Sequence, residues 1–140
     1  MQGFMGRDTM KKILCVDDEE AVLRCLKSVL EHSGYETITC SNPRDGLDLM
    51  NAETLDLVTL DIRMPEINGL EVYKTLKERQ KDTIPVIFIT AHATTFSMES
   101  DSLVKMWQKD FADGNTEILY KPFDISTLVE KVESLIGPAK

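Results

Sequence analysis

Short apolar segments alternate with longer amphipathic segments along most of the sequence. The apolar segments are rich in Val, Ile and Leu, and most of them end at a polar or charged residue. Such segments predict buried β-strands, and the apolar residues that recur at helical spacing between them predict amphipathic helices. The predicted strands occupy residues 13–16, 35–40, 55–60, 86–89 and 118–120.

Capping residues mark several helix ends. Gly34 suits the position just after a helix, and Asn42 followed by Pro43 suits the beginning of the next. Asp124 or Ser126 can cap the last helix. The predicted helices lie within residues 22–33, 43–50, 70–77, 94–113 and 124–136.

A strand followed by a helix, repeated five times, requires parallel strands joined by right-handed crossovers. Continuous apolar strands are expected when helices cover both faces of the sheet. The pattern therefore predicts a doubly wound α/β fold. In such folds the ligand site lies beyond the carboxyl ends of the strands.

Composition and charge narrow the class of protein. The chain has 140 residues, 42% hydrophobic and 29% charged, which suits one globular domain and excludes intrinsic disorder. Sixteen basic against 24 acidic side chains give a net charge of −8. This excess argues against a nucleic-acid binder and against adhesion to an anionic membrane.

Three cysteines form neither a CxxC pair nor a cluster with zinc-ligand spacing. They are predicted to be buried free thiols in a reducing compartment. The first ten residues lack the apolar centre of a signal peptide, and no apolar run is long enough to span a bilayer. A cytoplasmic location is expected.

Chemically distinctive residues follow four of the predicted strands. Asp17 and Asp18 follow the first, Asp61 the third, Thr90 the fourth and Lys121 the fifth. Carboxylates about 4 Å apart repel by roughly 4 kcal/mol per pair at an effective dielectric of 20, so a cation must join them. Oxygen ligands with room for water suit Mg²⁺ or Mn²⁺. Each residue alone has an ordinary structural explanation, but their coincidence at strand ends predicts a metal site.

These residues resemble the receiver domain of two-component response regulators. The resemblance covers about residues 11–136 and includes the small residue after the hydroxyl and the proline after the lysine. It implies the flavodoxin-like strand order 2-1-3-4-5, a tail at residues 1–10, a receiver at 11–137 and a tail or linker start at 138–140. The motifs are residues 16–19, 60–65, 69–70, 90–91 and 121–123.

The resemblance also implies a role for each site residue. Asp61 would accept a phosphoryl group, which Thr90, Ala91 and Lys121 would contact. Mg²⁺ would be bound by Asp18 and Asp61, by the backbone carbonyl of Arg63, and by Asp17 directly or through water. The bond between Lys121 and Pro122 is expected to be cis.

The sequence departs from the family in its signalling half. The interval between Thr90 and Lys121 is long, and Ile118 stands where an aromatic switch residue is common. Tyr120 is a candidate substitute for it, although an inert core tyrosine is the simpler interpretation. Arg63 and His92 are candidates for tuning phosphoryl lifetime, with inert surface residues as the alternative.

The expected function is a phosphorylation-controlled signalling switch rather than an enzyme, although it would catalyse its own phosphotransfer and autodephosphorylation. A histidine kinase or histidine phosphotransfer protein would be the donor, and a downstream output protein or domain the target. A second copy of the chain is a further candidate partner. The main alternative is a receiver-shaped interaction module without a phosphorylation-dependent readout. A phosphohydrolase would normally place an acid where Arg63 stands, and a nucleotide binder would need a Gly-rich phosphate loop.

Overall fold

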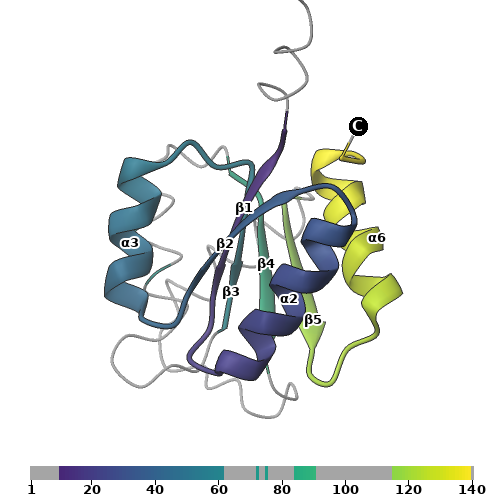
Figure 1. Cartoon of the computed structure of the whole chain (residues 1–140), viewed down its shortest axis with the longest axis horizontal. Helices are drawn as coiled ribbons and strands as arrows, with labels where there is room; N and C mark the ends of the chain where they lie inside the picture. The colour runs from purple at the N-terminus through teal and green to yellow at the C-terminus, as the bar shows by residue number, and fades with distance from the viewer. Residues whose placement is uncertain (1–9, 62–71, 73–74, 76–83, 91–114, 140) are drawn as a thin grey trace, which may run out of the picture.

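Five parallel strands form one sheet in the order β2-β1-β3-β4-β5 (Figure 1). The computed structural model describes residues 10–61, 72, 75, 84–90 and 115–139. Its strand order confirms the predicted doubly wound fold. The strands are β1 (Lys12–Val16), β2 (Glu36–Cys40), β3 (Leu57–Leu60), β4 (Val86–Thr90) and β5 (Thr116–Tyr120).

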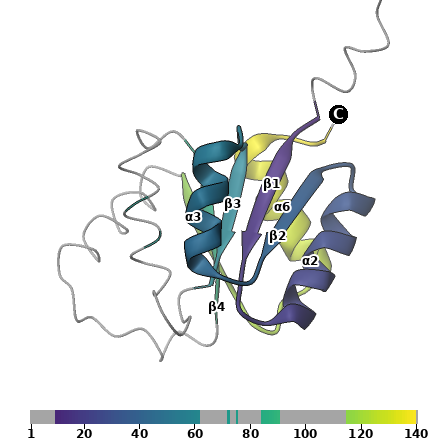
Figure 2. The same ribbon diagram turned by 60° about the vertical axis from the view of Figure 1, so that its left-hand side comes forward.

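Helices cover both faces of this sheet. The helices α2 (Glu20–His32) and α6 (Ile125–Ile136) lie against one face, and α3 (Pro43–Ala52) lies against the other (Figure 2). Val72 and Thr75 are helical, and the rest of the predicted helix at 70–77 lies outside the described residues. The predicted helix at 94–113 also lies outside them.

Local capping explains where α2 ends and where α3 begins. The Asn42 side chain accepts hydrogen bonds from the backbone N–H groups of Arg44 (2.7 Å) and Asp45 (3.3 Å), with Pro43 at the first helical position. Gly34, at φ 101°, follows the C-cap of α2 in a backbone conformation that other residues rarely adopt. Asp124 is the N-cap of α6, but its side chain makes no capping hydrogen bond.

The core has two parts, one on each side of the sheet. Side chains on alternate positions of the strands point to opposite faces, so each strand contributes to both parts. The part under α3 contains Leu14, Val16, Cys40, Met50, Leu55, Val58, Leu60, Val72, Ile84, Val86 and Phe88. The part under α2 and α6 contains Ile13, Cys15, Leu23, Leu26, Leu30, Tyr35, Leu57, Ile87, Ile89, Leu119, Leu128 and Val132.

The three cysteines are free thiols, as predicted, but they are not all buried. Cys15 and Cys40 are buried in the sheet, and burial raises the pKa of the Cys15 thiol to about 12. Cys25 is exposed, so the prediction of burial is wrong for this residue. The buried face of α2 is formed by leucines at helical spacing, including Leu23 and Leu26, and Cys25 falls on the opposite face.

A set of polar contacts fastens the end of α6 to the beginning of β1. The Lys11 ammonium donates to the backbone carbonyls of Ile136 (2.6 Å) and Pro138 (2.8 Å). The Tyr35 hydroxyl donates to the carbonyl of Gly137 at 2.9 Å. The carbonyls at the end of a helix lack intrahelical partners, and here side chains from other elements satisfy them.

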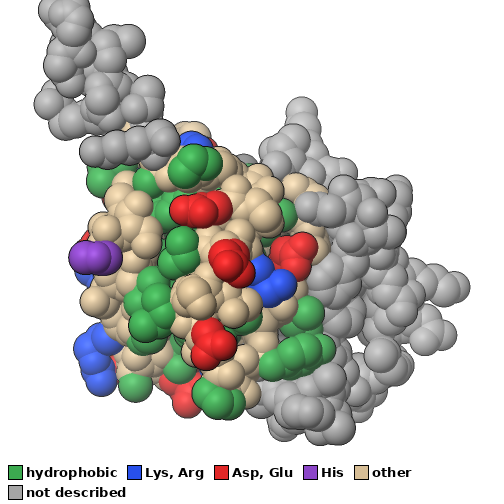
Figure 3. Space-filling model, turned by 90° about the vertical axis from the view of Figure 1, so that its right-hand side faces the viewer, with side chains coloured by type: hydrophobic (Ala, Val, Ile, Leu, Met, Phe, Trp, Pro, Cys, Tyr) green, Lys and Arg blue, Asp and Glu red, His purple; other side chains and the backbone are tan. Residues whose placement is uncertain are grey.

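Charged and apolar side chains are mixed on the described surface. Figure 3 shows the face at the right of Figure 1, where acidic, basic and apolar side chains are interspersed. None of the helices in the described part of the chain is long and apolar enough to cross a membrane.

Candidate functional site

The carboxyl ends of β1, β3 and β5 bring two aspartates and a lysine to one edge of the sheet. Asp17 follows β1, Asp61 follows β3 and Lys121 follows β5. The backbone N–H of Asp17 donates to the Cys40 carbonyl, and that of Asp61 donates to the Val16 carbonyl, each at 3.1 Å. Both aspartates therefore continue the hydrogen bonding of the sheet by one residue, which fixes their positions.

The Lys121 ammonium lies among three carboxylates. Its Nζ atom is 3.0 Å from Asp17 Oδ2 and 3.2 Å from Asp61 Oδ2. A third carboxylate, that of Glu19, lies closest, with Oε1 at 2.6 Å. The peptide bond between Lys121 and Pro122 is cis, as the resemblance implies.

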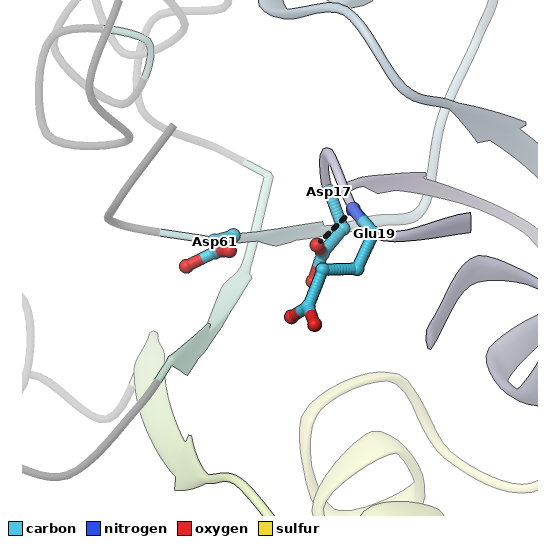
Figure 4. Close-up of side chains that lie close together, drawn as sticks. All are labelled: Asp17, Glu19 and Asp61. Carbon is cyan, nitrogen blue, oxygen red and sulfur yellow. Dashed lines mark hydrogen bonds between the residues drawn. The ribbon is translucent and has the colours of Figure 1, made fainter. Parts of the chain in front are cut away.

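Glu19 joins the cluster through the turn that links β1 to α2. Its backbone N–H donates to Asp17 Oδ1 at 2.9 Å, and the side chains of both residues lie near Asp61 (Figure 4). One carboxylate oxygen from each of Asp17, Glu19 and Asp61 lies within 4.8 Å of the other two. We call these three residues the acid cluster.

The acid cluster combines two buried carboxylates with one exposed carboxylate. The side chains of Asp17 and Asp61 are 2% and 6% exposed, whereas that of Glu19 is 58% exposed. The pKa of Asp17 is raised to about 6, because burial, helped by the Asp61 charge, outweighs the opposing contacts with Glu19 N–H and Lys121. Burial lowers the pKa of Lys121, but contacts with Glu19, Asp17 and Asp61 more than offset it, so the pKa lies above its ordinary value.

The acid cluster fits a hard divalent cation. Its donors are all carboxylate oxygens, the ligands that Mg²⁺ prefers. Three carboxylates against one ammonium leave a formal charge of −2, which a divalent ion would neutralise. Asp17 Oδ2 is buried and accepts no hydrogen bond, although it lies at ion-pair distance from Lys121. A buried carboxylate oxygen without a hydrogen bond is an available ligand.

Of the other residues predicted to bind the metal or the phosphoryl group, the structure describes the side chain of Asp18 alone. Asp18 is exposed and lies outside the acid cluster. Thr90 ends β4, where its backbone pairs with that of Tyr120, and its side chain lies outside the described residues. Arg63, Ala91 and His92 also lie outside the described residues, so their roles stay predictions.

The two candidate switch residues of β5 have different surroundings. Ile118 is partly buried and packs against the core under α3. Tyr120 is 39% exposed, so the interpretation of this residue as an inert core tyrosine is wrong. Tyr120 is the last residue of β5, where the sheet ends.

Sequence reasoning did not select Glu19 as a site residue. It lies in a run of four acids, and a run gives no indication of which side chains turn toward the sheet edge. The useful signal is its position just before α2, because an N-cap residue lies at the strand-to-helix turn above the carboxyl edge.

Comparison with known proteins identifies the family to which the chain belongs. The family model of the response regulator receiver domain matches residues 13–133, most of the chain. The chain is a response regulator receiver domain. Membership of this two-component signalling family confirms the resemblance inferred from the motifs, and it implies a histidine kinase as partner.

Two relatives illustrate the range of proteins that contain such a domain. This receiver domain is 34% identical over 131 residues to the polar-differentiation response regulator DivK of Brucella anthropi, covering 92% of this chain and 98% of DivK. It is 35% identical over 127 residues to the response regulator ArlR of Staphylococcus saprophyticus. That match covers 91% of this chain and 53% of ArlR, so the chain spans about half the length of ArlR.

Solved receiver structures share the fold. The response regulator TrrA of Thermotoga maritima, in complex with Mg²⁺-BeF, is 35% identical with a TM-score of 0.71, covering 90% of this chain and 99% of TrrA. A CheY-like receiver domain protein from Methanospirillum hungatei is 27% identical with a TM-score of 0.76, covering 91% and 94%. This chain therefore shares the receiver fold with solved receiver structures.

Proposed function

We propose that this receiver domain accepts a phosphoryl group on Asp61 in a Mg²⁺-dependent reaction, and that phosphorylation changes its binding to a downstream partner. The donor would be a phosphohistidine on a histidine kinase or a histidine phosphotransfer protein. The observation that carries the proposal is the position of Lys121, with its ammonium 3.0 Å from Asp17 Oδ2 and 3.2 Å from Asp61 Oδ2. A carboxylate so placed has a fixed positive charge beside it where phosphoryl oxygens would lie.

The reaction transfers the phosphoryl group between two nucleophiles. A carboxylate oxygen of Asp61 would attack phosphorus in line with the bond to the histidine nitrogen. The new O–P bond forms as the P–N bond breaks, and the imidazole leaves with the electron pair. The Asp61 side chain is buried, so few water molecules can reach the phosphorus atom and compete with the carboxylate.

The residues around Asp61 would stabilise charge and position the group. Lys121 would pair with a phosphoryl oxygen, and the Thr90 hydroxyl would donate to another. Asp17, Asp61 and the carbonyl of Arg63 would bind the metal, and Asp18 would have to turn toward the acid cluster to join them. Bound Mg²⁺ would supply positive charge to the phosphoryl oxygens.

Two further observations support the proposal. TrrA, whose structure contains Mg²⁺-BeF, is 35% identical to this chain. The acid cluster and Lys121 together carry a formal charge of −2, since three carboxylates are opposed by one ammonium, and one divalent ion would neutralise this charge. The identity of the metal, the phosphotransfer and the response of the partner remain parts of the proposal.

Incubation with Mg²⁺ and acetyl phosphate tests the proposal. Intact mass spectrometry should detect one added phosphoryl group, which is lost when the metal is chelated beforehand. Asp61→Asn should abolish the adduct, whereas Asp48→Asn, at an exposed position of α3, should leave it unchanged. Failure of the wild type to form an adduct, or persistence of the adduct in Asp61→Asn, would overturn the proposal. Partner binding without any adduct would favour an interaction module.

A further inference from the structure

Glu19 makes the shortest of the three contacts to Lys121, yet the proposed function gives it no role. Its Oε1 atom is 2.6 Å from Lys121 Nζ, against 3.0 and 3.2 Å for Asp17 and Asp61. The Glu19 backbone is itself held by Asp17, which accepts its N–H at 2.9 Å. Glu19 therefore reaches Lys121 from a fixed point on the rim of the site.

The Lys121 ammonium has as many N–H donors as it has carboxylate neighbours. An ammonium carries three donors, and the acid cluster supplies three carboxylates. The hydrogen bonds from Lys121 go to Glu19 and Asp61, so a phosphoryl oxygen on Asp61 would compete with these carboxylates for the ammonium. The contact of one of the carboxylates with Lys121 would then be weakened.

Exposure decides between the three. Asp17 and Asp61 are almost completely buried, so neither side chain can turn into water when its contact with Lys121 weakens. Glu19 is 58% exposed, and its carboxylate can turn into water and be hydrated. Glu19 is therefore the partner that Lys121 can release at the lowest free-energy cost.

We propose that Glu19 is a positioning residue that holds Lys121 in the unphosphorylated domain and releases it to the phosphoryl group. This inference rests on the proposed function of Asp61. A contact made in only one of two states stabilises that state. The pair between Glu19 and Lys121 therefore opposes the phosphorylated arrangement and reduces affinity for any phosphoryl group or its mimic at Asp61.

The size of this effect follows from the exposure of the pair. Ion pairs with an exposed partner contribute a modest free energy, which corresponds to a change in affinity of about two- to fivefold. Removing the pair should thus tighten binding of a phosphoryl mimic by about two- to fivefold. A metal-ligand role for Glu19 predicts a different result, because its removal would then weaken Mg²⁺ binding.

Beryllofluoride at saturating Mg²⁺ provides the probe, with affinity measured by isothermal titration calorimetry. Glu19→Gln removes the charge, and Glu19→Asp keeps the charge but is one methylene too short to maintain the 2.6 Å contact. Glu20→Gln is the matched control, since it removes an exposed acid at the next position. We expect Glu19→Gln and Glu19→Asp to tighten beryllofluoride binding by about two- to fivefold, and Glu20→Gln to leave it unchanged.

Several results would overturn the inference. Equal affinities for wild type and both Glu19 variants would show that the pair does not restrain Lys121. Tightening by Glu19→Gln but not by Glu19→Asp, or equal tightening by Glu20→Gln, would indicate a general charge effect. Weaker Mg²⁺ binding in Glu19→Gln, measured without beryllofluoride, would make Glu19 a metal ligand instead. If the wild type bound no beryllofluoride, the proposed function would fail first, and this inference with it.

Discussion

Replacing Asp17 by Asn should stabilise the metal-free domain at neutral pH, although it removes one partner of an ion pair. The Asp17 side chain is 2% exposed and shares its surroundings with the Asp61 and Glu19 carboxylates. Burial raises its pKa from 3.8 to about 6, so the native state holds the proton more tightly than the unfolded state does. Ionisation of Asp17 therefore costs folding free energy, and Asn, which is neutral at every pH, avoids this cost.

The magnitude follows from the two pKa values. Between pH 3.8 and 6 the native state binds more protons than the unfolded state, so stability falls as pH rises. The full shift corresponds to about 3 kcal/mol at pH 7.5, and about half of that is already present at pH 5. Asp17→Asn should thus gain about 3 kcal/mol over the wild type at pH 7.5, but only about half as much at pH 5.

Urea unfolding in the presence of EDTA, at several values between pH 5 and 7.5, measures this difference. Asp18→Asn is the matched control, because it makes the same change at the neighbouring exposed position. Its stability relative to wild type should vary little over this range. The reasoning is refuted if Asp17→Asn is less stable than wild type at pH 7.5, or if its advantage does not grow with pH.

Three further results are expected from the same structure. Mg²⁺ affinity, measured by calorimetry, should fall about tenfold per pH unit below pH 6, because Asp17 must lose its proton to bind the ion; a flat profile would contradict this. Phe88→Ala should cost about 3–5 kcal/mol in urea unfolding, against under about 0.5 kcal/mol for the exposed Ile125→Ala, since only Phe88 leaves a core cavity. Tyr35→Phe should cost about 1 kcal/mol and speed hydrogen exchange at the end of α6, because the hydrogen bond to Gly137 is lost; unchanged exchange would argue against that contact.

Much of the fold could be predicted because local signals and long-range packing agree. Asn42 and Pro43 predicted the beginning of a helix, and the structure confirms Asn42 as the N-cap of α3 and Pro43 as its first residue. The fifth strand was predicted too short, since β5 begins at Thr116 rather than Ile118. Thr116 and Glu117 are polar, and only their pairing with β4 makes them strand residues. That pairing is a tertiary contact that a local apolar pattern does not contain.

The acid cluster was predictable in part for the same reason. Asp17, Asp61 and Lys121 follow directly from strands, so the sheet alone brings them together. Asp18 and Glu19 lie in the turn after β1, where side-chain direction depends on the backbone path into α2. Both adjacent acids are exposed, but only the Glu19 carboxylate joins the acid cluster. Cys25 illustrates the same limit on a helix, where one position separates the buried face from solvent.

The contacts from Lys11 to the end of α6 have a practical consequence for handling the domain. They bring the beginning of β1 and residue 138 to one place, at the edge of the sheet opposite the acid cluster (Figure 1). A short peptide joining residue 139 to residue 10 could therefore close the backbone into a ring, and new ends could be opened elsewhere by circular permutation. A fluorophore or surface anchor attached at this junction would leave the acidic edge accessible to a phosphodonor.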